Sequence, residues 1–272
     1  PGISSAASDV YKRQIINNIS KDGYIILNAD DKFFSFFKSK SIKKKLRIVT
    51  FGIKKKSDVS LINIKKEKSL SVIYINFNKK KLKFIVKKNL ENYIYNILST
   101  LAVISIYFDL EKLDKFFFND YQFPEGRGDL NSVKLNKKKF NLIDESYNSN
   151  PLSLQFALNK LNNLNTKSKR KLILLGDMLE LGKYSKKLHS EAAQYINDTK
   201  IDRVYVYGKE VIETFNKIRP QKRGKILNSK KDILNFIRND IKDGEYLMIK
   251  GSNSTGLNKI SQSLKTGKLN AF

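Results

Sequence analysis

A pair of acidic residues followed by a polar turn marks the segment LIDESYNSNP, residues 142–151. Asp144 and Glu145 end an apolar run, and Ser, Tyr and Asn residues then lead to Pro151, where a helical pattern begins. A carboxylate at the end of a strand can accept hydrogen bonds from ligand hydroxyls such as those of a ribose. Neighbouring strand residues point to opposite faces of a sheet, so the two acids should not share one acid–base task. We predict that one faces a ligand and the other supports the fold.

Three further apolar runs end in residues that can bind a charged ligand. They end at Gly176-Asp177, at Gly208-Lys209 and at Lys250-Gly251-Ser252. Lysine side chains and backbone N–H groups in such places can hold a carboxylate or a phosphate. Each residue alone is better explained as a turn residue or a helix cap. Four such strand ends together favour a binding site, because ligands of parallel sheets bind at the carboxyl ends of the strands.

The second half of the chain alternates predicted strands with predicted helices. Apolar runs of strand length are followed by segments with apolar residues at helical spacing, and Pro151 suits the first turn of a helix. This rhythm is typical of βαβ units and predicts an α/β fold with a parallel, doubly wound sheet. The predicted strands span 139–146, 171–178, 202–208 and 245–252, and the predicted helices span 151–164, 187–198, 211–218 and 231–241.

The first half of the chain has a different pattern of apolar and polar residues. Alternating apolar and polar residues over 60–86, with Lys-rich turns, predict antiparallel strands. Asp30 and Asp31 end the first predicted strand, where a turn is favoured over a metal site. The other predicted elements are strands at 23–31 and 46–53 and helices at 92–108 and 110–118.

Two segments mark the limits of the predicted domains. FPEGRGDL (123–130) combines Pro with two Gly, and we place a domain boundary there, between residues 128 and 129. The Ser- and Ala-rich segment 1–14 is treated as a linker or a non-native remnant and is left out of the fold.

Composition excludes several classes of protein. The 272 residues contain no Cys, which excludes disulfides, thiolate metal sites and cysteine nucleophiles. No apolar run is long enough to span a membrane, and no signal peptide is visible, so a cytoplasmic protein is expected. The net charge of +27 could indicate nucleic-acid binding. The lysines are scattered through every segment, however, which favours a compositional bias and only weak, nonspecific binding.

Common catalytic motifs are absent from the sequence. It contains neither a GxxxxGK[ST] phosphate loop nor a GxGxxG fingerprint. His189 is the only histidine, so a histidine metal cluster or a Ser-His-Asp triad is strongly disfavoured. We interpret His189 as a surface or packing residue of its helix.

Several segments resemble the Mur ligase family. LIDESYNSNP is similar to the (D/E)SYNANP-type motif that opens the C-terminal domain of the members that add D-alanyl-D-alanine. LILLGDMLELG (172–182) resembles their GDMxELG segment, and LMIKGSNSTGLNKI (247–260) resembles their closing KGS segment. Upstream, ILNADD, TFG, NYIYNILSTLAV and FPEGRG occur in the family's order. The resemblance covers residues 15–265.

This resemblance implies a two-part fold and an activity. Residues 15–128 would be the later part of the family's central ATPase domain, and residues 129–272 its Rossmann-like, doubly wound C-terminal domain. The implied enzyme uses ATP to phosphorylate the terminal carboxylate of UDP-N-acetylmuramoyl-tripeptide and joins it to D-alanyl-D-alanine, for peptidoglycan synthesis. The implied cofactors are ATP and Mg²⁺, with the Mg²⁺ ligands outside this chain. A monomer without a specific nucleic-acid partner is expected.

The family's functional residues carry over to matching positions of this sequence. Asn96 would lie near the adenine, and Arg127 would reach the ATP phosphates. Asp144 or Glu145 would hold the ribose. Arg127 and Lys250 are the candidate catalytic residues. The candidate substrate-binding residues are Asn148, Asn150, Asp177, Lys250 and Ser252.

The chain departs from the family pattern at two points. NLENYIYN lacks the histidine of the family's GxHNxxN-like segment, and the sequence has no GKT/S phosphate loop. It is therefore expected to be an N-terminally truncated ligase that is inactive alone. The alternative is a stand-alone, non-catalytic Rossmann-like binding module. A GKT/S loop encoded in frame upstream would favour the ligase.

Overall fold

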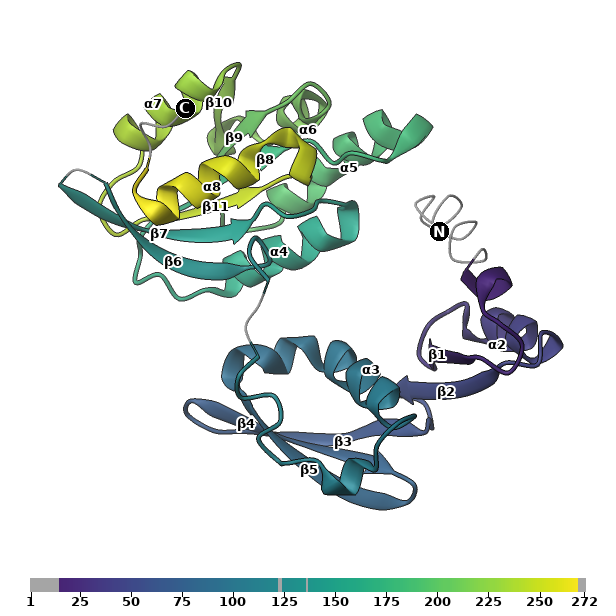
Figure 1. Cartoon of the computed structure of the whole chain (residues 1–272). Helices are drawn as coiled ribbons and strands as arrows, with labels where there is room; N and C mark the ends of the chain where they lie inside the picture. The colour runs from purple at the N-terminus through teal and green to yellow at the C-terminus, as the bar shows by residue number, and fades with distance from the viewer. Residues whose placement is uncertain (1–14, 122–123, 136, 269–272) are drawn as a thin grey trace. The chain divides into compact units, whose positions relative to one another are not determined.

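The chain folds into two compact units (Figure 1). A computed structural model describes residues 15–121, 124–135 and 137–268. Unit 1 comprises residues 1–122 and unit 2 residues 123–272. Each unit has its own sheet and its own packed helices. Among the described residues, no helix has the length and apolar character needed to span a membrane.

Unit 1 is built on a five-stranded sheet with the order β1-β2-β3-β4-β5. β1, β2 and β3 run parallel, whereas β3, β4 and β5 form an antiparallel meander. Every second residue of β4 is buried over most of its length, as expected for a strand with one face on a core. The elements are β1 (Tyr24–Asn28), α2 (Phe34–Lys43), β2 (Arg47–Gly52), β3 (Val59–Lys66), β4 (Leu70–Phe77), β5 (Lys80–Lys87) and α3 (Ile94–Ile104).

Unit 2 has a six-stranded sheet with the order β10-β9-β8-β11-β7-β6. All neighbouring strands are parallel except β6, which is antiparallel to β7. β11 is the last strand in the sequence, yet it lies between β7 and β8. The elements are β6 (Asp129–Leu135), β7 (Lys138–Glu145), α4 (Pro151–Asn163), β8 (Lys171–Gly176), α5 (Ser185–Asn197), β9 (Arg203–Tyr207), α6 (Val211–Lys217), β10 (Arg223–Leu227), α7 (Lys230–Asn239), β11 (Tyr246–Lys250) and α8 (Leu257–Thr266).

Helices cover both faces of the unit 2 sheet and enclose two apolar cores. Leu172 and Leu174 of β8 belong to the core that α7 and α8 cover. Ile173 and Leu175 belong to the other core, under α4, α5 and α6. Every residue of β8 is buried, as expected for a central parallel strand covered on both faces. Burial on both faces explains why the inner strands of unit 2, such as β8, form continuous apolar runs in the sequence.

The predicted fold class is confirmed, and the strands and helices predicted for unit 2 are all present. The antiparallel strands predicted over 60–86 are also present, as β3, β4 and β5. The prediction does not include α2, β6, β10 and α8. β6 and β10 are edge strands, and their sequences mix polar with apolar residues because one side of each strand pairs with no other strand.

The helix predicted over 110–118 is wrong. Only a short 3₁₀ turn, Leu110–Lys112, forms in this segment. The carbonyl of Lys115 instead accepts a hydrogen bond from the N–H of Ile85 in β5, at 2.7 Å. Phe118 is buried. Contacts with the sheet therefore outweigh the helical spacing of the apolar residues.

The Pro- and Gly-rich segment 124–128 packs with unit 2. The chain's contacts divide it between residues 122 and 123, whereas the sequence places the boundary between 128 and 129. The N–H of Gly128 donates to the carbonyl of Asp144 at 2.6 Å. The segment is thus part of the C-terminal unit, because its backbone hydrogen bonds are made there.

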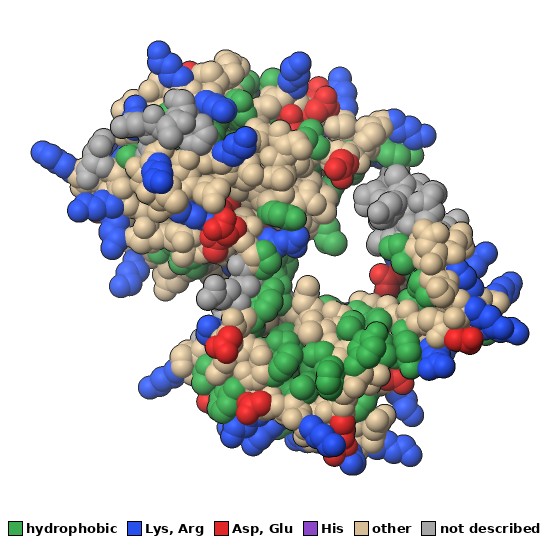
Figure 2. All heavy atoms as spheres, in the orientation of Figure 1, with side chains coloured by type: hydrophobic (Ala, Val, Ile, Leu, Met, Phe, Trp, Pro, Cys, Tyr) green, Lys and Arg blue, Asp and Glu red, His purple; other side chains and the backbone are tan. Residues whose placement is uncertain are grey.

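Lysine and arginine side chains are spread over both units on the face shown in Figure 2. A protein built to bind nucleic acid would gather its cations on one face or along one groove. On the face shown, the cations do not gather in one patch or groove.

Truncation tests the assignment of residues 124–128 to unit 2. We expect a chain of residues 123–272 to unfold cooperatively, and a chain of residues 129–272 to unfold cooperatively but with lower stability. Losing the hydrogen bonds of Gly126 and Gly128 should lower the free energy of unfolding by about 1–3 kcal/mol. Urea unfolding followed by circular dichroism measures the difference. Equal stability of the two pieces would contradict the assignment.

Candidate functional site

The polar strand ends of unit 2 meet at one edge of its sheet. Lys250, at the end of β11, lies beside Glu145 at the end of β7 and beside Leu175 of β8. Gly176 of β8 pairs with Tyr207 at the end of β9. The predicted convergence of these four strand ends is therefore confirmed, and the loops that follow them form one continuous edge.

Asp144 faces the α8 side of the sheet and supports the fold. Its side chain is buried, and one carboxylate oxygen accepts from the N–H and the hydroxyl of Ser146, at 3.1 and 2.5 Å. The other oxygen lies 2.5 Å from the ammonium group of Lys265. These partners leave little acceptor capacity for a ribose, so Asp144 fits the supporting role of the acidic pair.

Glu145 points to the opposite face, toward α4. Its carboxylate lies near Lys160, Lys250 and the backbone of Gly128. Within the described part of the chain, this carboxylate makes no hydrogen bond or ion pair. Burial raises the pKa of Glu145 above its ordinary value, although the two lysines oppose the shift. Glu145 is therefore the acid of the pair that keeps its acceptor capacity.

Lys250 is enclosed by protein, with 1% of its surface exposed. Its Nζ donates to the carbonyl of Asn148 at 2.9 Å, while the Asn148 side chain is exposed. Burial lowers the pKa of Lys250, and the nearby Glu145 opposes this shift. Lys250 thus ties the end of β11 to the turn at residues 146–150. A direct contact between Lys250 and a substrate stays a prediction.

Three of the predicted substrate-binding side chains accept hydrogen bonds from the backbone of nearby helices or loops. The side-chain oxygen of Asn150 accepts from the N–H of Ser153 at 2.8 Å and forms the capping box that begins α4. Asp177 accepts from the N–H of Val211, the first residue of α6, at 2.8 Å. The hydroxyl of Ser252 accepts from an N–H of the loop after β8 at 2.9 Å. Their proposed contacts with a substrate stay predictions.

Arg127 presents an exposed cation beside the same sheet edge. Its guanidinium group lies 4.5 Å from the centre of the Tyr147 ring, within the range of a cation–π contact. The Tyr147 side chain is itself exposed. A guanidinium group in this position can bind phosphate oxygens through two parallel hydrogen bonds.

Two cavities flank the end of β7. One of about 290 Å³ lies on the α8 side, between the 124–126 segment and the residues Asp144, Ser146 and Tyr147. The other, of about 60 Å³, lies on the α4 side and is lined in part by Glu145. The two acids therefore open onto different cavities, as expected from their opposite directions on the strand.

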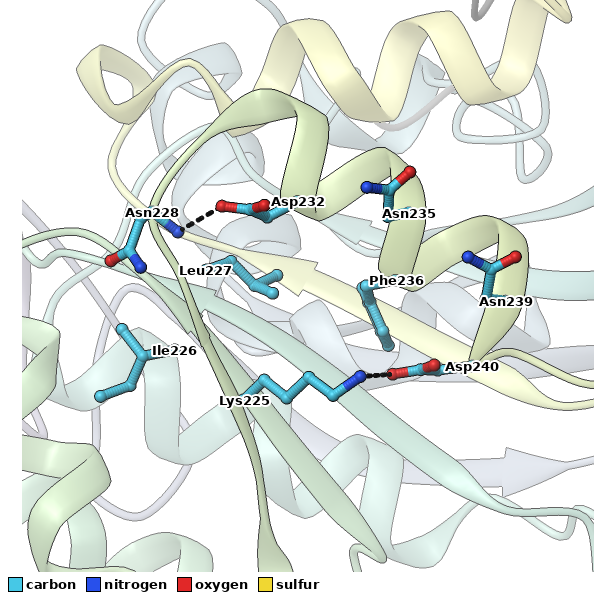
Figure 3. A pocket seen from close by; sticks show the side chains of 9 residues that line it. All are labelled: Lys225, Ile226, Leu227, Asn228, Asp232, Asn235, Phe236, Asn239 and Asp240. Carbon is cyan, nitrogen blue, oxygen red and sulfur yellow. Dashed lines mark hydrogen bonds and ion pairs between the residues drawn. The ribbon is translucent and has the colours of Figure 1, made fainter.

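A further cavity of about 270 Å³ lies between β10 and α7 (Figure 3). Its carboxylates are engaged by neighbours. Asp232 accepts from the N–H of Asn228 at 3.0 Å, and Asp240 pairs with Lys225 at 3.1 Å. None of the predicted site residues lines this cavity, so we assign no function to it.

The predicted adenine contact, Asn96, is exposed on α3 of unit 1. The hydroxyl of its neighbour Tyr95 donates to Asp30 at 3.2 Å, and the N–H of Ile53 donates to the same carboxylate at 2.6 Å. Burial raises the pKa of Asp30, but hydrogen bonds from backbone N–H groups lower it overall. These contacts fit the turn interpretation of the Asp30 and Asp31 pair. No group of three or more His, Asp or Glu side chains in the described residues is placed to hold a metal ion.

His189 is fully buried, so the surface alternative is wrong and the packing alternative holds. Its Nδ1 donates to the carbonyl of Ser185 at 2.9 Å, and its Nε2 accepts from the N–H of Met178 at 3.0 Å. These two bonds define a neutral imidazole with its proton on Nδ1. The side chain therefore holds the start of the loop that follows β8.

No sequence motif indicates Lys160 and Lys265, the two lysines that complete the site. Lys160 donates to the carbonyl of Gly128 at 3.0 Å, and Lys265 contacts Asp144. Both are surface-type residues of helices in a chain with 53 Lys and Arg. Their spacing carries no signal, because their partners are distant in sequence.

Comparison with known proteins identifies the family. Residues 130–253 match the family model of the Mur ligase glutamate ligase domain, and residues 10–104 match that of the Mur ligase middle domain. The chain belongs to the Mur ligase family. The second match begins at residue 10, so residues 10–14 of the segment interpreted as a linker or a non-native remnant lie within the family match.

Curated relatives of the chain are UDP-N-acetylmuramoyl-tripeptide--D-alanyl-D-alanine ligases. The chain is 27% identical to the Rickettsia prowazekii ligase over 252 residues, which are 92% of this chain and 54% of that protein. It is 28% identical to a Buchnera aphidicola ligase over 269 residues, 97% of this chain and 55% of that protein. The Bacillus subtilis ligase is 32% identical over 126 residues, 45% of this chain and 27% of that protein. The chain thus spans about half the length of the first two relatives.

Solved structures share the fold. MurF ligase from Thermotoga maritima in complex with ADP has a TM-score of 0.71 at 17% identity, covering 98% of this chain and 59% of that one. MurF from Acinetobacter baumannii has a TM-score of 0.72 at 19% identity, covering 96% and 55%. At these identities the likeness supports the arrangement of strands and helices alone.

Replacing Glu145 by Gln tests whether the ionised Glu145 carboxylate lowers the stability of the fold. A carboxyl group with a raised pKa in the folded state costs stability once it ionises, so the cost is absent below its unfolded pKa and grows as the pH rises through its folded value. We expect E145Q to raise the free energy of unfolding at pH 7 by on the order of 1 kcal/mol, and the gain to vanish in acid. Urea unfolding across this pH range measures it.

The exposed Glu180 offers a matched control for this experiment. E180Q should change the free energy of unfolding little, because the Glu180 side chain lies in water. A loss of stability in E145Q at pH 7 would show that Glu145 is stabilised by its lysine neighbours.

Replacing His189 by Leu tests the hydrogen bond between His189 and the loop after β8. H189L leaves the N–H of Met178 without an acceptor in a buried place, which should lower the free energy of unfolding by about 1–3 kcal/mol. Thermal and urea unfolding measure the loss. Q194L, at an exposed position of the same helix, is the control and should change stability little. An H189L chain as stable as the parent would contradict the assigned hydrogen bond.

Proposed function

We propose that this chain is part of an ATP-dependent ligase that joins D-alanyl-D-alanine to UDP-N-acetylmuramoyl-tripeptide in the cytoplasm. The names of its curated relatives support this substrate pair. The ADP complex of the Thermotoga maritima MurF ligase supports a nucleotide as cofactor. The family membership applies to both units, since one family model matches each of them.

One observation carries the proposal: in the described structure, a half-buried carboxylate without a hydrogen-bond partner lies at the sheet edge where ligands of such folds bind. Glu145 stands at the end of β7 between Lys160 and Lys250, and its pKa is raised by burial. Carboxyl groups whose pKa is shifted by their surroundings concentrate at functional sites. The hydroxyls of a bound ribose would supply the missing hydrogen bonds.

Two residues of the chain would contact ATP. Arg127 would hold phosphate oxygens, and Glu145 would accept from the ribose. ATP, when bound, supplies the phosphoryl group that activates the tripeptide carboxylate. The addition of an amine to an activated carboxyl group passes through an anionic intermediate, which positive groups and N–H donors stabilise. We assign no residue of this chain to Mg²⁺.

The turn at residues 146–150 would border the D-alanyl-D-alanine site. Its exposed Asn148 can contact the dipeptide, and Lys250 holds the turn through the Asn148 carbonyl at 2.9 Å. Asn150 sets the position of the turn by capping α4. In this arrangement Lys250 also contributes positive potential beside the anionic intermediate, without leaving its buried place.

No observation favours the alternative, a non-catalytic binding module. It predicts ligand binding without any acceptor-dependent turnover. The half-buried Glu145 is compatible with both candidates, whereas the ligase names of the relatives favour the enzyme.

A chimaeric enzyme tests the proposed activity. The matching 252-residue part of the Rickettsia prowazekii ligase is replaced with this chain, and ADP release is measured with UDP-N-acetylmuramoyl-tripeptide. We expect ADP release to depend on D-alanyl-D-alanine, and L-alanyl-L-alanine to serve as the inactive control. R127A should lower kcat/KM by about 100-fold or more, because a phosphate contact is lost.

One further result separates the candidates. A folded chimaera that binds ADP but releases none in response to D-alanyl-D-alanine would contradict the ligase and favour the binding module. Circular dichroism and thermal unfolding of the chimaera establish that it is folded.

A further inference from the structure

The segment that carries Arg127 is bonded to unit 2 on both sides of that residue. We call residues 124–128 the strap. Before Arg127, the N–H of Gly126 donates to the Asp129 carboxylate at 3.1 Å, and the carbonyl of Gly126 accepts from the N–H of Tyr147 at 3.2 Å. Gly126 has a φ of +75°, and a Cβ there would lie 2.9 Å from the Tyr147 nitrogen. Glycine therefore allows this close approach.

The other side of Arg127 is held in the same way. The N–H of Gly128 donates to the carbonyl of Asp144 at 2.6 Å, and the carbonyl of Gly128 accepts from Nζ of Lys160 at 3.0 Å. Gly128 has a φ of +90°, and a Cβ there would lie 2.6 Å from the Glu145 carboxylate. The peptide groups on both sides of Arg127 thus have partners in the body of unit 2.

A single cation of α8 joins the two acids to which the strap is attached. Nζ of Lys265 lies 2.5 Å from the Asp129 carboxylate and 2.5 Å from the Asp144 carboxylate. Asn131 donates to the same Asp129 oxygen at 2.7 Å. The Lys265, Asp144 and Asp129 side chains are 14%, 4% and 27% exposed, so water screens the Lys265–Asp144 pair little and the Lys265–Asp129 pair more.

The triad and the strap are connected through these carboxylate residues. Asp129 receives the Gly126 N–H directly, and Asp144 receives the Gly128 N–H through its carbonyl. Lys265 holds both acids from the α8 side, and it makes no hydrogen bond or ion pair with residues 124–128 in the described structure. Removing its charge would leave two carboxylates close together without a counterion, and their repulsion would loosen both attachments.

We propose that Lys265 is a positioning residue for Arg127. It fixes the strap to unit 2, so that the guanidinium group stays above the Tyr147 ring and beside the sheet edge that holds Glu145. The phosphate contact of Arg127 rests on the proposed function. The attachment of the strap by Lys265 does not, and it can be tested without any ligand.

Hydrogen exchange of glycine amides tests the attachment directly. Labelling the chain of residues 1–272 with ¹⁵N-glycine limits the NMR spectrum to its 13 glycines, which include Gly126 and Gly128. Gly176, buried in β8, reports on the core of unit 2. In K265M we expect the protection of Gly126 and Gly128 to fall by about tenfold or more, with Gly176 unchanged.

Two further variants and a second signal complete the experiment. K259M, at an exposed position of the same helix, should leave all glycine amides unchanged. K265R keeps a cation that can reach both carboxylates and should restore most of the protection. The ring current of Tyr147 shifts the side-chain protons of Arg127, and this shift should decrease in K265M and return in K265R.

Two outcomes would overturn the proposal. If K265M leaves Gly126, Gly128 and the Arg127 shift unchanged, Lys265 does not hold the strap. If K265M lowers the protection of Gly176 in parallel with Gly126 and Gly128, Lys265 only supports the unit as a whole. A selective loss in the strap that K265R reverses supports the positioning role.

The chimaeric ligase separates this inference from the proposed function. If the chimaera is active, K265M should raise its KM for ATP by about fivefold or more, as expected when a phosphate-binding group is misplaced, with a smaller change in kcat. An unchanged KM beside a loosened strap would overturn the positioning of Arg127 for catalysis. If the chimaera is folded but inactive, the proposed function fails, while the exchange experiment still decides whether Lys265 holds the strap.

Discussion

The insertion of β11 between β7 and β8 is the constraint on which the rest of unit 2 depends. It is the last strand in the sequence, yet it pairs along its whole length with strands that precede it by more than one helix. This pairing places Lys250 beside Glu145 and carries the following α8 onto the face where Asp144 lies. Because the strand is central, both cores and both sides of the site require the C-terminal part of the chain.

The charged side chains on the two faces of the sheet edge differ in whether they have hydrogen-bond and ion-pair partners. On the α8 side, Asp144 is hydrogen-bonded to Ser146 and paired with Lys265, and the resulting triad holds the strap. On the α4 side, Glu145 and Lys250 lie near one another without forming an ion pair. Burial raises the pKa of Glu145 and lowers the pKa of Lys250, which favours the neutral form of each side chain. The first arrangement gains stability from its charges. On the α4 side, the Glu145 carboxylate can still accept hydrogen bonds from a ligand, and its burial lowers the stability of the fold.

Much of unit 2 could be predicted from the sequence, because strands buried on both faces must be continuously apolar. The prediction fails where tertiary contacts compete with local pattern. Residues 110–118 have helical spacing, yet their backbone bonds to β5. His189 looks like an ordinary helical residue, and only the packed structure shows that it accepts a backbone hydrogen bond. The strap reads as a domain linker because Pro and Gly are common to linkers and to tight, bonded turns.

The sequence by itself determined the class of fold, the strand ends that form the site edge and the resemblance to a ligase family, since apolar runs, turn residues and motifs are local properties. Only the tertiary structure decided which acid of the Asp144 and Glu145 pair is free for a ligand. That choice depends on Lys265, which is distant in the sequence and carries no motif. Burial and pairing are properties of the folded surroundings, and the same residue types can take either role until the chain has packed.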